Sequence, residues 1–110
     1  MSTDANAEIL ERLFAVIESR RGADPDSSYT AKLLAGGPKK IAKKIGEESA
    51  EVIIAALSEG KDALTLESAD LLYHLLVMWS AIGVKPEDVY AELARREGTS
   101  GIAEKNSRKK

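Results

Sequence analysis

The sequence predicts an all-α fold, a helical bundle of four to five helices in one domain. Apolar residues recur every three or four positions along most of the 110-residue chain, which is the spacing of one helix face. Glycine and proline divide the periodic segments at the points where helices would end and begin. No segment alternates between apolar and polar residues as a half-buried strand would.

The first two helices are expected to be short. The apolar stripe of residues 9–17 predicts a helix that Gly22 closes, and residues 22–28, with their Asp-Pro-Asp segment, predict a loop. Ser28 can then cap a second helix, which the pair Gly36-Gly37 stops.

Three further helices are predicted by their boundary residues. Pro38 and Pro86 each suit the first position of a helix, because that position leaves its N–H unbonded and proline has none. Gly60, Gly83 and Gly98 stand where the helices would end. The expected ranges are about 38–60, 64–82 and 86–98. Residues 1–98 are thus expected to form the helical domain, and residues 99–110 a polar, basic tail that is loosely held.

Composition narrows the function classes. The chain has no cysteine, and its N-terminus lacks the basic and apolar regions of a signal peptide, so we expect a cytoplasmic protein. Its longest apolar run is too short to span a bilayer, and a net charge of −2 gives no reason to expect nucleic acid. We therefore expect neither a membrane nor a nucleic-acid partner.

Residues 71–82 predict a homodimer. Their apolar side chains cover nearly every direction around the helix axis, and such a helix must be covered on all sides. A chain of this length can scarcely do so alone, so a second copy is expected to bury one face. The alternative is a fully central helix in a monomer.

Two acidic motifs, Glu48-x-x-Glu51 and Glu67-x-x-Asp70, lie inside apolar helical segments. At about 100° per residue, Glu48 falls in the middle of an apolar stripe and Glu51 lies beside it. If the two helices are antiparallel neighbours joined by residues 58–65, all four carboxylates converge toward the core.

Such convergence requires compensation. Carboxylates about 5 Å apart repel by about 3 kcal/mol per pair at an effective dielectric constant of about 20, and the six pairs would exceed the stability of a small domain. The group must be protonated, neutralised by lysine, or bound to a cation. Ligation by carboxylates alone selects a hard ion, Mg²⁺ or Mn²⁺, and Mg²⁺ commonly shares its shell with substrate phosphates. The alternative is a set of surface pairs such as Lys43–Glu47 and Lys44–Glu48.

Two further features have two interpretations each. The lysines at positions 39, 40, 43 and 44 could bind phosphates beside the metal or pair with Glu47 and Glu48. His74 could orient a metal ligand without touching the metal, or could be a hydrogen-bonded core residue.

The pattern Glu47-Glu48-x-x-Glu51, a fifteen-residue spacer and Glu67-x-x-Asp70 resembles the signature of the MazG-like all-α nucleoside triphosphate pyrophosphatases. Within that superfamily the chain is similar to the phosphoribosyl-ATP pyrophosphohydrolase family of histidine biosynthesis. The segments that carry the closer similarity are Ser28-Tyr29-Thr30-Ala31-Lys32-Leu33-Leu34, Lys44-Ile45-Gly46-Glu47-Glu48, Ala69-Asp70-Leu71-Leu72-Tyr73-His74 and Gly98-Thr99-Ser100-Gly101-Ile102-Ala103-Glu104-Lys105. The segment Gly36-Gly37-Pro38 departs from the family pattern but removes no expected ligand.

The resemblance implies a reaction, hydrolysis of phosphoribosyl-ATP to phosphoribosyl-AMP and pyrophosphate. It implies Glu48, Glu51, Glu67 and Asp70 as Mg²⁺ ligands. Glu47 projects from the same turn and could deprotonate or orient the attacking water. The candidates for binding substrate phosphates are Lys40, Lys43, Lys44, Lys105 and Arg108. Two alternatives remain, a house-cleaning pyrophosphatase acting on other nucleotides at the same metal site and a non-catalytic helical dimerisation module.

Overall fold

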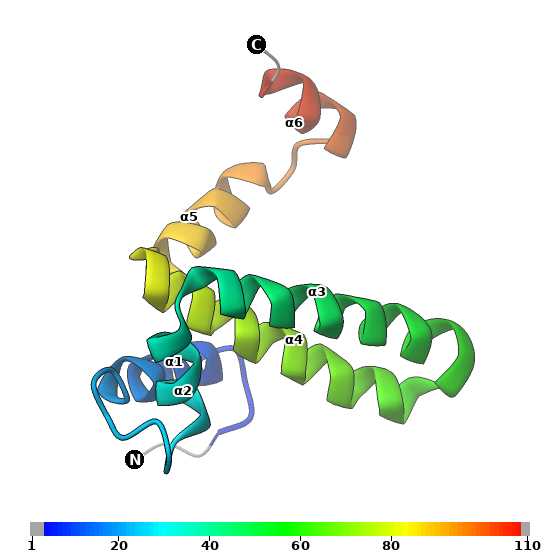
Figure 1. Ribbon diagram of the computed structural model, residues 1–110. Helices are drawn as coiled ribbons and strands as arrows, with labels where there is room; N and C mark the ends of the chain where they lie inside the picture. Colours follow the sequence, from blue (N-terminus) through cyan, green and yellow to red (C-terminus); the bar gives the residue numbers. More distant parts are fainter. Residues whose placement is uncertain (1–3, 109–110) are drawn as a thin grey trace.

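The computed structural model describes residues 4–108 and confirms the all-α fold. Within those residues it contains six α-helices, one π-helical turn (η1) and no strand (Figure 1). The elements are α1 (Ile9–Ser19), α2 (Tyr29–Gly36), α3 (Pro38–Ile54), η1 (Ala55–Glu59), α4 (Lys61–Ile82), α5 (Pro86–Arg96) and α6 (Gly101–Ser107). In the described part of the chain, no helix is long and apolar enough to cross a membrane.

Helices α3 and α4 form a long antiparallel hairpin (Figure 1). Its connection is shorter than the expected residues 58–65, because η1 continues α3 and α4 already begins at Lys61. The N–H of Gly60 donates to the carbonyl of Ala55 at 3.0 Å, which closes the wide turn. Gly60 has a φ of 102°, a backbone conformation that favours glycine, so one residue reverses the chain.

The core lies at one end of this hairpin, where α1 and α2 pack against it (Figure 1). Five apolar side chains from α1 to α4 are almost fully buried there, namely Ile17, Leu33, Ile41, Leu76 and Val77. Ser28 caps α2 as expected, its Oγ accepting from the N–H of Ala31 at 3.1 Å. Gly37, with a φ of 85°, both ends α2 and precedes Pro38 at the start of α3.

The C-terminal segment differs from the expected loosely held tail. Residues 101–107 form α6, which raises the number of helices above the expected four to five. The carboxylate of Glu104 is buried and lies 2.7 Å from Arg95 and 3.0 Å from Arg108. The pair with Arg95 joins α6 to α5, whereas the pair with Arg108 is local to the end of α6. The spacing of apolar residues could not indicate the contact with α5. The division at residue 98 stays a prediction, and residues 1–3 and 109–110 of the two expected regions lie outside the described residues.

We predict that Glu104→Gln frees α6 while leaving the helical body folded. Hydrogen bonds to charged groups contribute about 1.5–3 kcal/mol, so amide exchange in residues 101–107 should accelerate by about tenfold or more. Native-state hydrogen exchange measures this, with Glu97→Gln, an exposed neighbour, as the matched control. Unchanged exchange in Glu104→Gln would mean that the ion pairs do not hold α6.

Candidate functional site

The acidic motifs meet across the α3–α4 hairpin. Glu48 of α3 is 7% exposed, Glu67 of α4 is half-buried, and Asp70 is exposed one turn further along α4. One oxygen from each carboxylate lies within 4.8 Å of the other two. The prediction that these side chains converge is therefore confirmed for three residues from two helices.

The carboxylates carry more negative charge than the protein compensates. Burial raises the pKa of Glu48, and the nearby Glu51 raises it further. Burial also raises the pKa of Glu67, followed by the charges of Glu51 and Asp70. Oε1 of Glu67 is buried without a hydrogen-bond partner among the described residues. A bound proton or a bound cation would relieve this arrangement.

Glu51 lies at the edge of the group and not among its three converging oxygens. It is exposed, and with Glu67, Ile54 and Glu59 it lines a depression of about 120 Å³ near the hairpin connection. The expectation that all four carboxylates point into the core therefore differs from the structure, which buries Glu48 most deeply. Sequence reasoning missed Glu59, because its direction depends on the π-helical turn and not on a regular 100° step.

His74 links the acidic group to α2. It is 5% exposed, and its Nδ1 lies 2.7 Å from the backbone carbonyl of Asp70. Since a carbonyl only accepts, Nδ1 carries the hydrogen, and in the neutral ring Nε2 accepts from the Tyr29 hydroxyl at 3.1 Å. The next residue, Thr30, bonds through its hydroxyl to that of Tyr73. Tyr29 was not among the predicted site residues, although its segment contributed to the family resemblance.

The candidate phosphate-binding residues lie in two places. Lys44 is half-buried on α3, with its Nζ 3.2 Å from Oε1 of Glu47 in place of the expected pairs at i,i+4 spacing. Lys43 is exposed, and the stem of Lys40 lies over Gly36 at the end of α2. Lys105 lies in α6 and Arg108 directly follows it, and Figure 1 shows α6 beyond α5 and away from the hairpin connection. In the single chain, Lys40, Lys43 and Lys44 therefore lie on the same helix as Glu48. Lys105 and Arg108 do not lie beside that helix (Figure 1).

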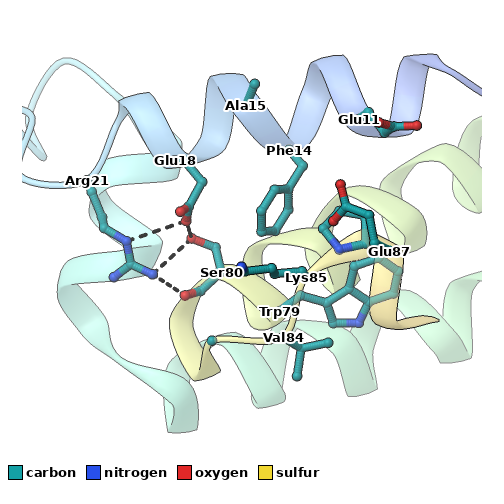
Figure 2. A pocket seen from close by; sticks show the side chains of 12 residues that line it. Glu11, Phe14, Ala15, Glu18, Arg21, Trp79, Ser80, Val84, Lys85 and Glu87 are labelled. Atoms are coloured by element: carbon teal, nitrogen blue, oxygen red, sulfur yellow. Dashed lines mark hydrogen bonds and ion pairs between the residues drawn. The ribbon is translucent and has the colours of Figure 1, made fainter. Parts of the chain in front are cut away.

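A larger cavity of about 390 Å³ lies elsewhere, between α1, the end of α4 and the start of α5. Figure 2 shows the rings of Phe14 and Trp79 beside it, and Arg21 bonded to Glu18 and Ser80 at one end. Ser80 is buried and also donates to Glu18, so these polar groups satisfy one another. Because the converging carboxylate oxygens among the described residues lie at the hairpin and not at this cavity, we place the candidate functional site at the acidic group.

Comparison with known proteins identifies the family of the chain. The family model described as phosphoribosyl-ATP pyrophosphohydrolase matches residues 10–97, which include all four predicted ligands. A phosphoribosyl-ATP pyrophosphatase of Paramagnetospirillum magneticum is 65% identical over 105 residues, covering 96% of each chain. A protein with the same name from Azospirillum brasilense is 56% identical, covering 94% of each chain. Another from Rhodospirillum rubrum is also 56% identical, covering 100% of this chain and 94% of the relative.

We predict that Glu48→Gln stabilises the metal-free protein at neutral pH. A carboxyl pKa raised above its ordinary 4.5 means that the folded state holds the proton more tightly, so stability falls as pH rises through the folded pKa. Glu48→Gln has no carboxyl to ionise and so keeps the stability that the wild type loses at neutral pH. The difference in unfolding free energy between the two proteins should shrink toward pH 4. Urea unfolding in EDTA at several pH values measures the effect.

Glu47→Gln is the matched control, since Glu47 lies next in the chain but is exposed and paired with Lys44. It should not reproduce the stabilisation. In excess Mg²⁺ the wild type should be more stable than Glu48→Gln, because the wild type then gains binding free energy that the variant lacks. A less stable metal-free Glu48→Gln would contradict the account of uncompensated charge.

Proposed function

The chain belongs to the phosphoribosyl-ATP pyrophosphohydrolase family, and we propose that it works through a divalent cation held between α3 and α4. It hydrolyses phosphoribosyl-ATP to phosphoribosyl-AMP and pyrophosphate in histidine biosynthesis, the activity of its family and named relatives. The observation that carries the cation proposal is the convergence of three carboxylate oxygens within 4.8 Å of one another.

The residues fit a hard divalent cation. The converging atoms are all oxygens, which Mg²⁺ and Mn²⁺ prefer, and Oε1 of Glu67 is a buried acceptor without a partner. Oxygens bound to one Mg²⁺ at about 2.1 Å lie closer together than 4.8 Å, so small side-chain rotations would complete the shell. The depression beside Glu51 and Glu67 has room for the water that Mg²⁺ usually keeps. We propose Mg²⁺ as the ion, with Mn²⁺ as a substitute.

Each residue near the cation has a proposed role. When bound, the cation neutralises charge on phosphate oxygens and lowers the pKa of an attacking water. Glu48, Glu67 and Asp70 would hold it, and Glu51 would join directly or through water. Glu47, exposed on the same turn of α3 as Glu48, would orient or deprotonate the attacking water. His74 would fix the α4 backbone at Asp70 through its Nδ1.

Cations on α3 would receive the substrate phosphates. Lys40, Lys43 and Lys44 precede the acidic motif by one to two turns, and Lys44 already lies beside Glu47. Lys105 of α6 and Arg108 directly after it would serve the same purpose, after movement of that helix or from a second copy of the chain. In this structure Arg108 is paired with Glu104 instead.

We also propose that the protein is a homodimer. The α3–α4 hairpin exposes large apolar side chains on both helices and on the turn between them, namely Ile53, Ile54, Leu57, Leu66 and Leu72. Leu57 is 81% exposed, which is costly unless another surface covers it. A second copy would cover these residues and the outer face of α4. A cytoplasmic location without membrane or nucleic-acid partners stays a prediction.

We predict that Glu48→Gln, Glu67→Gln and Asp70→Asn each weaken Mn²⁺ binding and hydrolysis of phosphoribosyl-ATP. Loss of a residue that merely supports a metal ligand costs about 10–100-fold, so loss of a ligand should cost at least about 100-fold in kcat/KM. Electron paramagnetic resonance measures Mn²⁺ affinity separately from activity. Glu97→Gln, outside the acidic group, should retain both.

The same assay decides the substrate. Wild-type protein with Mg²⁺ should prefer phosphoribosyl-ATP over dUTP, dCTP and ATP. A preference for a deoxynucleotide would favour the house-cleaning alternative. Full activity and Mn²⁺ affinity in the three variants would contradict the proposed metal site.

We predict that Leu57→Lys and Leu66→Lys shift the protein from dimer to monomer, because a charge would replace an apolar contact. Sedimentation velocity measures the change. Ile102→Lys is the matched control, since Ile102 is equally exposed but lies on α6. A monomeric wild type at micromolar concentration would refute the dimer.

A further inference from the structure

Tyr29 is oriented opposite to most tyrosines at a protein surface. A tyrosine usually packs its apolar ring against the protein and keeps its hydroxyl near water. Here the hydroxyl points inward to Nε2 of His74, which is 5% exposed, while the residue as a whole is 51% exposed. The apolar ring is therefore presented outward.

The ring is held in this position from several sides. Tyr29 is the first residue of α2, directly after the capping residue Ser28. The Tyr73 ring lies nearly parallel to it, with centroids 6.1 Å apart and 23° between planes. The His74 ring meets it edge-on, at 6.0 Å. Because the hydroxyl is also bonded, the Tyr29 ring cannot easily fold down onto the protein.

This ring lies next to the acidic group. Its partner His74 is bonded to the backbone of Asp70. On the α3 side, Tyr29 lies near enough to Lys44 to raise the pKa of that ammonium, after the larger effect of Glu47. The exposed ring is thus flanked by a metal-binding helix and a phosphate-binding candidate.

We propose that Tyr29 is a substrate-binding residue whose exposed ring stacks on the heteroaromatic base of the nucleotide. The proposal rests on the proposed function, since it requires the substrate phosphates to lie at the cation and Lys44. In a nucleotide only the ribose separates the phosphates from the base, so a base platform must border the phosphate site. Among the described aromatic residues of α2 and α4 near the acids, Tyr29 is the exposed one.

The test compares Tyr29→Leu with Tyr29→Phe. Stacking on an aromatic side chain is sequence-tolerant and its loss weakens binding by about 5- to 150-fold. We therefore expect Tyr29→Leu to raise KM for phosphoribosyl-ATP within that range. Tyr29→Phe keeps the ring and loses only the bond to His74, so its KM should rise much less. Circular dichroism verifies that each variant is folded.

Two further readouts separate stacking from support of the metal site. Mn²⁺ affinity, measured by electron paramagnetic resonance, should be the same in Tyr29→Leu and Tyr29→Phe, because both variants lose the bond to His74. The inhibition constant of inorganic tripolyphosphate, which has phosphates but no base, should also be unchanged. Thr30→Val is the matched control, because it breaks the neighbouring bond to Tyr73 without removing an exposed ring.

Three results would overturn the proposal. An unchanged KM in Tyr29→Leu would exclude stacking, and equal losses in Tyr29→Leu and Tyr29→Phe with weaker Mn²⁺ binding would show that Tyr29 acts through His74. Dissociation of a dimer by Tyr29→Leu with KM unchanged would show that the ring contacts a second copy. In each case wild-type hydrolysis and its loss in Glu48→Gln would persist, whereas inactivity of the wild type toward phosphoribosyl-ATP would refute the proposed function itself.

Discussion

The repulsion between carboxylates held across the α3–α4 hairpin is the constraint on which this structure depends. Oxygens of Glu48, Glu67 and Asp70 lie within 4.8 Å of one another, and burial raises the pKa of the first two carboxyls. Apolar packing of the hairpin against α1 and α2 must hold these groups together against their charge. The acidic group therefore lowers the stability of the folded protein, as is typical of sites that bind a ligand of opposite charge.

Helix α2 joins the apolar core to this charged region. Leu33 on one face of α2 is buried in the core, whereas Tyr29 and Thr30 at its start bond to His74 and Tyr73 of α4. Both bonds reach the turn of α4 that follows Asp70. The short helix therefore fixes the position of α4 on the side where the acidic group opens to solvent. This gives a physical reason for the Ser-Tyr-Thr-Ala segment, which periodicity alone leaves unexplained.

Much of the fold and part of the site followed from local patterns. The helix-capping role of Ser28, Pro38 at the start of α3 and the burial of Glu48 within an apolar stripe are all confirmed. The position of Glu51 at the edge of the acidic group and the participation of Glu59 did not follow. Glu59 lies on the π-helical turn η1, and the place of Glu51 relative to the other carboxylates depends on how α3 packs against α4. The fold of α6 depends on ion pairs of Glu104 with arginines of α5, for which helical spacing gives no signal.

By itself the sequence determined the helical segments before residue 98, which acids lie on apolar faces and, through resemblance, which reaction to expect. These properties depend on residues close together in the chain, whose directions follow from a step of about 100° per residue. Only the tertiary structure decided which carboxylates share a site and that Tyr29 turns its hydroxyl inward to His74. Such relations join residues about 20 to 45 positions apart in the chain. Their geometry is set by how the helices pack against one another, which no single helical pattern encodes.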